Sequence, residues 1–158
     1  MEQFTVNQIG KIKNNGGEIT IELEQKYIPA LKGLDGFSHL NVFWWFDDCD
    51  NEISRNSLEA LSPYKGSPEV MGTFATRSPM RPNPLALTTV QILFIEPDMG
   101  IIHIPYIDAN DNTPVIDLKP YTPSLDRIEN PKVPEWCSHW PKSVEESANF
   151  DWASQFNF

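Results

Sequence analysis

Strand-like segments follow one another along this chain with no long amphipathic helix between them. The clearest is GEITIELE at residues 17–24, where Ile19, Ile21 and Leu23 face one way and polar side chains face the other, as in a strand with one solvated face. A doubly wound α/β sheet alternates strands with helices, so this order argues against one. We therefore predict a mainly β fold: an antiparallel sheet curled into a barrel, with short helices and no Rossmann sheet.

The other strand candidates span residues 4–13, 37–46, 68–76, 85–96, 100–107 and 113–123. The segment 37–46, FSHLNVFWWF, is apolar on both faces and suits a central buried strand. Turns are expected at NNGG, residues 14–17, and at EPDMG, residues 96–100. Short helical turns are expected within 28–36 and 54–61.

The length of 158 residues suits one domain with a sizeable core. We place that domain at residues 1–128 and expect the aromatic tail, residues 129–158, to pack on it or on a partner chain, since a disordered tail is rarely so aromatic. The sequence shows no signal peptide, and its longest apolar run near the middle, VFWWF, is too short to span a bilayer. Two distant cysteines make no disulfide framework, so we expect a soluble, cytoplasmic protein.

Acidic residues outnumber basic ones by 22 to 12, for a net charge of −10. Affinity for nucleic acid comes largely from phosphate contacts, so such binders normally carry a basic surplus. The charge therefore disfavours a large RNA partner, although a local basic patch could still bind one.

Two arginines lie in the proline-rich stretch GTFATRSPMRPNPLAL, residues 72–87. Three prolines stiffen the loop and present Arg77, Arg81 and Asn83 with little entropy left to lose. Arginine suits forked recognition of carboxylate or phosphate. The alternative is a proline-rich connecting loop whose arginines pair with acidic residues on the surface.

A second polar stretch, DANDNTPVIDLKPY, spans residues 108–121. Strand alternation puts Asp117, Lys119 and Tyr121 on one face, where an acid, a cation and a phenol could hold a substrate or move a proton. The plainer interpretation, which the residues alone favour, is an Asx-rich turn followed by a surface Asp–Lys pair.

Other chemistry finds little support in the sequence. The acidic run FDDCDNE, residues 46–52, matches no EF-hand spacing, and no zinc motif is present, so we predict no metal. The chain has no Walker-type loop, no Rossmann fingerprint and no G-x-S-x-G elbow.

Taken together, three stretches resemble the signature blocks of the TrmO/TsaA-like family of S-adenosylmethionine-dependent tRNA methyltransferases. They are GLDGFSHLNVFWWF, GTFATRSPMRPNPLAL and NTPVIDLKPYTP, in the family's order and with similar spacing. The resemblance covers roughly residues 6 to 126. It implies a β-barrel-like fold, S-adenosylmethionine as cofactor, a homodimer, and methylation of N6 of threonylcarbamoyladenosine in tRNA.

The resemblance also assigns residues to roles. The cofactor-binding positions would be Asp47, Asp48, Arg77, Leu87, Asp111, Asn112, Thr113 and Pro114. Arg81, Asn83 and Lys119 are then left to bind substrate. We hypothesise from their chemistry that Asp117, Lys119 and Tyr121 are catalytic, with Asp117 or Tyr121 accepting the proton of the methylated nitrogen. The alternatives are a methyltransferase of the same fold that acts on a small molecule or a protein, and a non-catalytic ligand-binding module.

Overall fold

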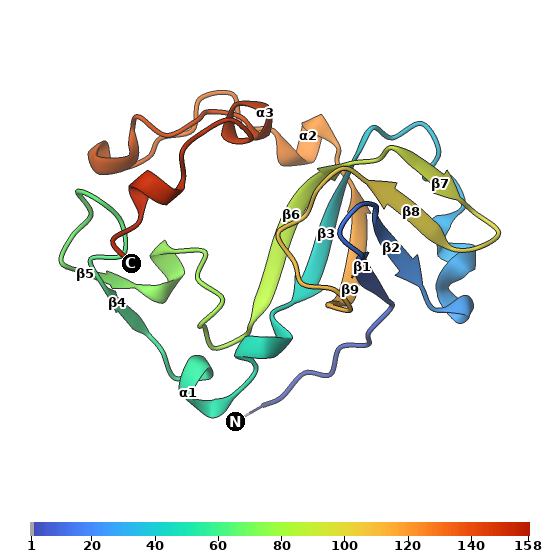
Figure 1. The fold of residues 1–158 in the computed structure, drawn as a ribbon, viewed down its shortest axis with the longest axis horizontal. Helices are drawn as coiled ribbons and strands as arrows, with labels where there is room; N and C mark the ends of the chain where they lie inside the picture. The colour runs from blue at the N-terminus through green and yellow to red at the C-terminus, as the bar shows by residue number, and fades with distance from the viewer. Residues whose placement is uncertain (1) are drawn as a thin grey trace. The chain divides into compact units, whose positions relative to one another are not determined.

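A computed structural model describes residues 2–158 of the chain (Figure 1). The chain divides into two compact units. The first contains the residues up to Asp50 together with Pro84–Arg127, and the second contains Asn51–Asn83 together with Ile128–Phe158. The two are described separately below.

The first unit is built on a seven-stranded sheet with the order β6-β3-β9-β1-β2-β8-β7 (Figure 1). Neighbouring strands of this sheet pair in antiparallel fashion. The strands are β1 (Gly10–Asn14), β2 (Ile19–Leu23), β3 (His39–Trp45), β6 (Leu85–Gln91), β7 (Phe94–Glu96), β8 (Ile101–Ile104) and β9 (Pro114–Pro120). The prediction of a mainly antiparallel fold is confirmed, and residues 2–158 contain no Rossmann-type arrangement.

The sheet is open, so the barrel-like fold that the sequence predicts is not a closed barrel. Strands β6 and β7 lie at the two ends of the order, and within the described residues no ladder joins them. A closed barrel requires hydrogen bonds between its first and last strands. Strand β7 has three residues and β6 has seven, so β7 is too short to pair along the length of β6.

The core lies on one face of this sheet and is almost entirely aliphatic. The fully buried side chains there include Ile12, Ile21, Leu40, Val42, Ile102, Ile104, Ile107 and Val115. Burial at about 25 cal/mol per Å² of apolar surface makes this cluster the main source of stability of the unit. The sequence predicts a central buried strand over residues 37–46; β3 is an interior strand between β6 and β9, but it is second in the sheet order rather than central.

Several expected boundaries differ from the structure. The first strand begins at Gly10, and residues 2–9 form no strand. The turn expected at NNGG is confirmed: it joins β1 to β2, with Gly16 in the left-handed region at φ 79°. The expected helical turn within 28–36 is a 3₁₀ helix, η1 (Gln25–Leu31). The segment 85–96 is two strands, and β7 then forms the predicted hairpin with β8.

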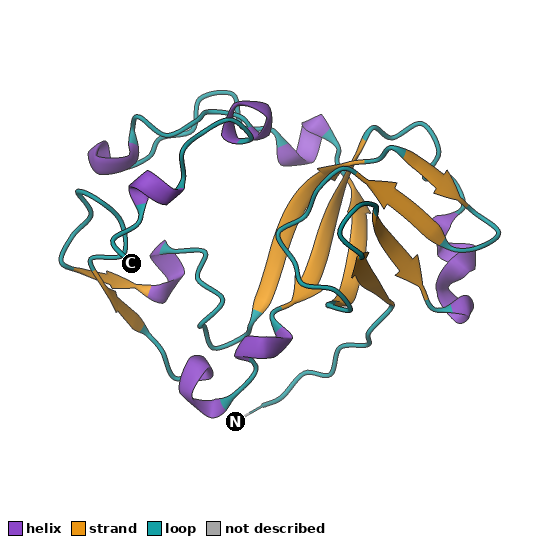
Figure 2. Cartoon of the chain, in the orientation of Figure 1, coloured by secondary structure: helices purple, strands orange, loops and turns teal. Residues whose placement is uncertain are grey.

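The second unit consists of short elements joined by loops (Figure 2). The prediction of a helix over 54–61 is correct only for its first two residues, because α1 (Glu52–Arg55) ends at Arg55. Residues 59–61 instead form β4 (Glu59–Leu61), which pairs with β5 (Val70–Gly72). The strand expected over 68–76 likewise stops at Gly72 and continues as η3 (Thr73–Ala75). Backbone pairing across the two-stranded sheet overrides the local helical preference.

The aromatic tail belongs to this second unit. Its helical turns are η4 (Glu135–Cys137), α3 (Val144–Ser147) and η5 (Ala153–Gln155). Tyr64 stacks on Trp136 with ring centroids 5.5 Å apart and also meets Trp140 and Phe156. The tail therefore packs on the 51–83 segment. Within residues 2–158, no helix has both the length and the apolar character needed to cross a membrane.

Candidate functional site

The face of the sheet opposite the core carries a band of polar and aromatic side chains over β6, β3 and β9. Phe43 of β3 lies opposite Leu87 of β6 and opposite Asp117 of β9, and Asn41 lies opposite Lys119. Residues directly opposite each other in a ladder share a face, as do alternate residues of one strand. The structure therefore brings Leu87, Asp117 and Lys119 together on this outer face.

Asp117 and Lys119 form an ion pair on that face. The Lys119 Nζ to Asp117 Oδ2 distance is 2.6 Å, and Nζ lies 5.7 Å from the centre of the Phe43 ring. Both charged side chains are at least half exposed, so the pair contributes little to stability. This is the Asp–Lys pair of the plainer interpretation, but it lies beside an aromatic ring on an open face, where a substrate could reach both groups.

Tyr121 continues the same face just beyond β9. Its backbone N–H donates to the His39 carbonyl at 3.0 Å, and the His39 and Tyr121 rings meet edge to face with centroids 6.3 Å apart. The alternation expected for Asp117, Lys119 and Tyr121 therefore holds, and β3 supplies a neighbour to each of the three.

A hydrogen bond between distant parts of the sequence joins two of the predicted cofactor segments. Asp47 and Asp48 start η2 (Asp47–Cys49), the 3₁₀ turn after β3, and both are exposed. Asn110 Nδ2 donates to Asp48 Oδ2 at 2.9 Å, across 62 positions of sequence. The acidic turn after β3 therefore lies against the turn before β9.

The turn before β9 is anchored to β1. Asp111 Oδ1 accepts a hydrogen bond from the Asn14 backbone N–H at 2.9 Å, and the Asn112 side chain bonds to both Lys13 and Asp111. Asn112 adopts φ 68°, a left-handed conformation that asparagine tolerates better than most residues.

The two residues after Asn112 lead into the strand. Thr113 is 3% exposed and its carbonyl accepts from the Ile12 N–H at 2.9 Å, while half-buried Pro114 begins β9 opposite Lys11. Backbone and side-chain bonds therefore hold the position of all four predicted turn residues, 111–114.

The remaining predicted residues, Arg77, Arg81 and Asn83, belong to the second unit. Their loop is braced by its own hydroxyls: Thr76 Oγ1 donates to the Thr73 carbonyl at 2.8 Å and accepts from the Ser78 N–H at 3.2 Å. Arg81 is half-buried and donates to the Ser78 carbonyl at 3.3 Å, whereas Arg77 and Asn83 are exposed.

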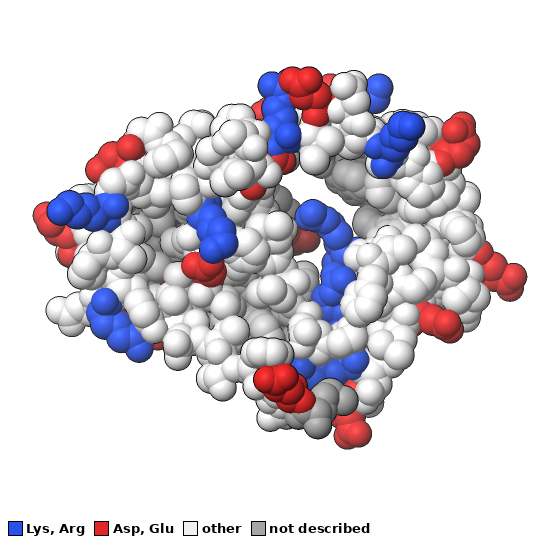
Figure 3. All heavy atoms as spheres, turned by 180° about the vertical axis from the view of Figure 1, so that it is seen from behind, with Lys and Arg blue, Asp and Glu red and all other residues white. Residues whose placement is uncertain are grey.

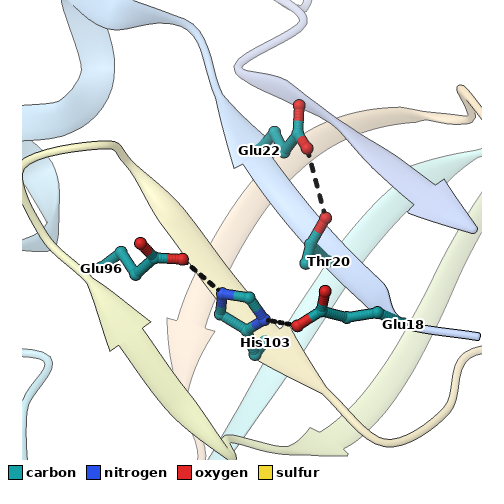
Figure 4. Close-up of polar contacts among 5 residues, drawn as sticks. All are labelled: Glu18, Thr20, Glu22, Glu96 and His103. Carbon is teal, nitrogen blue, oxygen red and sulfur yellow. Dashed lines mark hydrogen bonds and ion pairs between the residues drawn. The ribbon is translucent and has the colours of Figure 1, made fainter.

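A buried histidine that sequence reasoning missed lies on β8 (Figure 4). His103 is 6% exposed; its Nδ1 lies 2.6 Å from Glu18 Oε1 and its Nε2 lies 2.7 Å from Glu96 Oε1. The Nδ1 contact is an ion pair by distance and lacks hydrogen-bond alignment. The Phe94 ring stacks on the imidazole with centroids 3.7 Å apart. The sequence does contain a signal for this residue: a histidine interrupts the apolar run at residues 101–104.

This arrangement does not resemble a metal centre. Glu18 and Glu96 approach opposite nitrogens of one ring, so the three groups cannot converge on a single ion. Among residues 2–158, no group of three or more His, Cys, Asp or Glu side chains could hold a metal.

The open antiparallel sheet, with a polar outer face and an Asp/Asn turn beside it, defines a β-sheet domain outside the Rossmann class. The sequence profile of the "tRNA-methyltransferase O N-terminal domain" matches residues 6–127, and the chain belongs to this family.

Relatives of known name agree with this assignment. The "S-adenosyl-L-methionine-binding protein" of Archaeoglobus fulgidus is 37% identical over 108 residues, which cover 68% of this chain and 72% of that protein. The "tRNA (adenine(37)-N6)-methyltransferase" of Escherichia coli is 34% identical over 130 residues, covering 80% of this chain and 54% of the enzyme.

A solved structure shows the same fold. The crystal structure of TrmO from Pseudomonas aeruginosa superposes with a TM-score of 0.63 at 25% identity, covering 83% of this chain and 62% of that one. The chain spans less than two thirds of several relatives, including 29% of a longer Archaeoglobus fulgidus protein that is 35% identical over 115 residues.

Proposed function

We propose that the chain binds S-adenosylmethionine and methylates N6 of threonylcarbamoyladenosine in tRNA. The observation that carries this proposal is the Asn110–Asp48 hydrogen bond, because it joins the two segments that match the family's cofactor contacts. The names of the Archaeoglobus and Escherichia coli relatives support the cofactor and the reaction.

The residues of the two turns suit the chemistry of this cofactor. S-adenosylmethionine carries a sulfonium and an ammonium group, and Asp47 and Asp48 present exposed carboxylates that attract cations. Asp111, Asn112, Thr113 and Pro114 would complete the binding turn, and Leu87 adds an apolar side chain that is 41% exposed. Arg77 would bind an anionic group, as the family resemblance implies.

The cofactor, when bound, supplies an electrophilic methyl group. The residues of the outer face would orient the methyl acceptor and remove its proton. Asp117 or Tyr121 would accept the proton from N6, and Lys119, 2.6 Å from the Asp117 carboxylate, would stabilise developing negative charge on the acceptor. Lys119 would also bind the substrate, and so would Arg81 and Asn83 of the second unit. Most of the rate would come from positioning.

A second candidate acceptor, a small molecule or a protein, is favoured by the charge of the chain. The net charge is −10, and Figure 3 shows basic side chains interspersed with acidic ones on the face drawn. Binding of tRNA should weaken steeply with salt, whereas binding of a small acceptor should change little. A third possibility, a ligand-binding module without turnover, predicts cofactor binding with no methyl transfer.

The homodimer and the cytoplasmic location are further parts of the proposal, both drawn from the family resemblance. Light scattering tests the dimer directly, and a monomer at micromolar concentration would contradict it.

The first test is calorimetric titration of S-adenosylmethionine into cofactor-free protein. Asp48→Asn removes one carboxylate charge while keeping an acceptor for Asn110, and it should weaken binding about tenfold, or ~1.4 kcal/mol. Arg77→Ala tests the anionic contact in the same way. Asp98→Asn, the same change at an exposed position of the β7–β8 hairpin, is the matched control and should bind as the wild type does.

The second test is methyl transfer from labelled cofactor to tRNA that carries threonylcarbamoyladenosine. Asp117→Asn, Lys119→Met and Tyr121→Phe should each lower turnover while leaving cofactor affinity unchanged. Lys32→Met, at an exposed lysine of the same unit, is the control. Wild-type protein that binds the cofactor but leaves tRNA unmethylated at low salt would remove the tRNA assignment.

A further inference from the structure

The outer face contains one buried amide that the proposed reaction does not use. Asn41 of β3 is 8% exposed, and both ends of its side chain are bonded. Its Oδ1 accepts from Thr89 Oγ1 of β6 at 2.7 Å, and its Nδ2 donates to Asp126 Oδ1 at 3.1 Å. A buried amide costs free energy unless it is paired, so these bonds specify where its partners lie.

Asp126 extends the connection to the segment after β9. It lies in α2 (Pro123–Asp126), and its second oxygen accepts from the Thr122 backbone N–H at 2.6 Å. Thr122 directly follows Tyr121, whose own N–H is bonded to the His39 carbonyl. The backbone on both sides of the Tyr121 side chain is therefore tied to β3, once directly and once through Asp126 and Asn41.

We propose that Asn41 is a positioning residue that fixes Tyr121 on the outer face through Asp126. This inference rests on the proposed function, in which Tyr121 acts on the methyl acceptor. An apolar side chain at position 41 could fill the same space between β6 and β9, but it would leave α2 without its bond to the sheet. The amide thus holds a loop residue at a defined place rather than adding to the core.

Two single variants and their charge-swapped combination test the connection, and the combination keeps the net charge of the wild type. In Asn41→Asp, the new carboxylate faces the carboxylate of Asp126. In Asp126→Asn, the side chain keeps only one acceptor oxygen for two donors, the Asn41 amide and the Thr122 N–H, so one of these two hydrogen bonds is lost. In the double variant N41D/D126N, the amide at 126 donates to the carboxylate at 41 and its oxygen still accepts from Thr122. All three bonds can form again.

The primary readout, which does not depend on activity, is hydrogen–deuterium exchange of the peptide covering residues 119–127. We expect each single variant to exchange about tenfold faster there than the wild type and the double variant to return to the wild-type rate. Asp98→Asn should leave this peptide unchanged. If the single variants exchange at the wild-type rate, or if the double variant does not recover, the inference is overturned.

The second readout separates positioning from general stability. Each single variant should lower kcat for tRNA methylation about 10- to 100-fold, with S-adenosylmethionine affinity unchanged, and the double variant should recover. Altered exchange with unchanged kcat would also overturn the positioning role. If the wild type itself does not methylate tRNA, the proposed function fails, and exchange alone decides whether Asn41 fixes the segment. Asp126 is exposed, so D126N keeps the test available should N41D not fold.

Discussion

The left-handed backbone at Asn112 supports a sharp prediction about the turn that would bind the cofactor. Asn112 has φ 68°, where most L-residues are strained by about 1–2 kcal/mol and glycine is not. Alanine at this position removes the side-chain hydrogen bonds and adds strain that asparagine largely avoids, whereas glycine removes the hydrogen bonds without adding strain. The two substitutions therefore separate the contribution of the backbone from that of the side chain.

The magnitude follows from the contacts of Asn112. Its hydrogen bonds to Lys13 and Asp111 are exposed, so their loss should cost a few tenths of a kcal/mol each. Asn112→Ala should then lose about 1.5–2 kcal/mol in total. Asn112→Gly should lose about 0.5–1 kcal/mol, mainly through the greater entropy of the unfolded chain. For this length, each kcal/mol corresponds to about 2–4 °C in Tm.

Urea denaturation followed by far-ultraviolet circular dichroism measures the stability difference, and calorimetric titration of S-adenosylmethionine measures its effect on the turn. Asn15→Ala is the control, because Asn15 is exposed in the adjacent β1–β2 turn and does not adopt a positive φ. Asn112→Ala should be less stable than Asn112→Gly and should bind the cofactor more weakly. Equal stability of the two variants would refute the argument from backbone strain.

Three further substitutions or reactions probe other parts of the chain. Thr88→Val removes the acceptor of the buried Trp44 indole N–H, at 3.0 Å, and should cost about 1–3 kcal/mol by urea denaturation. Ile21→Ala opens a cavity at a fully buried site and should cost about 2–5 kcal/mol in the same assay. Burial raises the pKa of the Cys137 thiol, so at pH 8 less of it is thiolate, and a colorimetric thiol reagent should react with Cys137 more slowly than with half-buried Cys49. Equal rates for the two cysteines would contradict that reasoning.

The strands that carry the site were predictable because their local patterns agree with their environment. Residues 37–46 are largely apolar and form an interior strand of the sheet, and alternation along 117–121 places the acid, cation and phenol on one face. The helix expected over 54–61 failed because residues 59–61 find a pairing partner at 70–72, which no local pattern reveals.

Contacts between segments that are distant in the chain could not be predicted from the sequence. The Asn110–Asp48 bond spans 62 positions, and the carboxylates beside His103 come from different segments than the histidine itself. A residue pattern specifies the face of a strand but not which remote side chain lies over it. The order of the sequence motifs was enough to indicate the family of the chain. The hydrogen bonds around Asn41 could be found only in the three-dimensional structure.

Strand β3 couples the stability of the first unit to the proposed site. Leu40 and Val42 lie in the core, whereas Asn41 and Phe43 on the opposite face contact Asp126 and Lys119. A shift of one residue in register would exchange the two faces, so the burial of Leu40 and Val42 also fixes the outer face. A core substitution that loosens β3 should therefore lower turnover as well as stability. A substitution in the two-stranded sheet of the second unit that causes an equal loss of stability need not lower turnover.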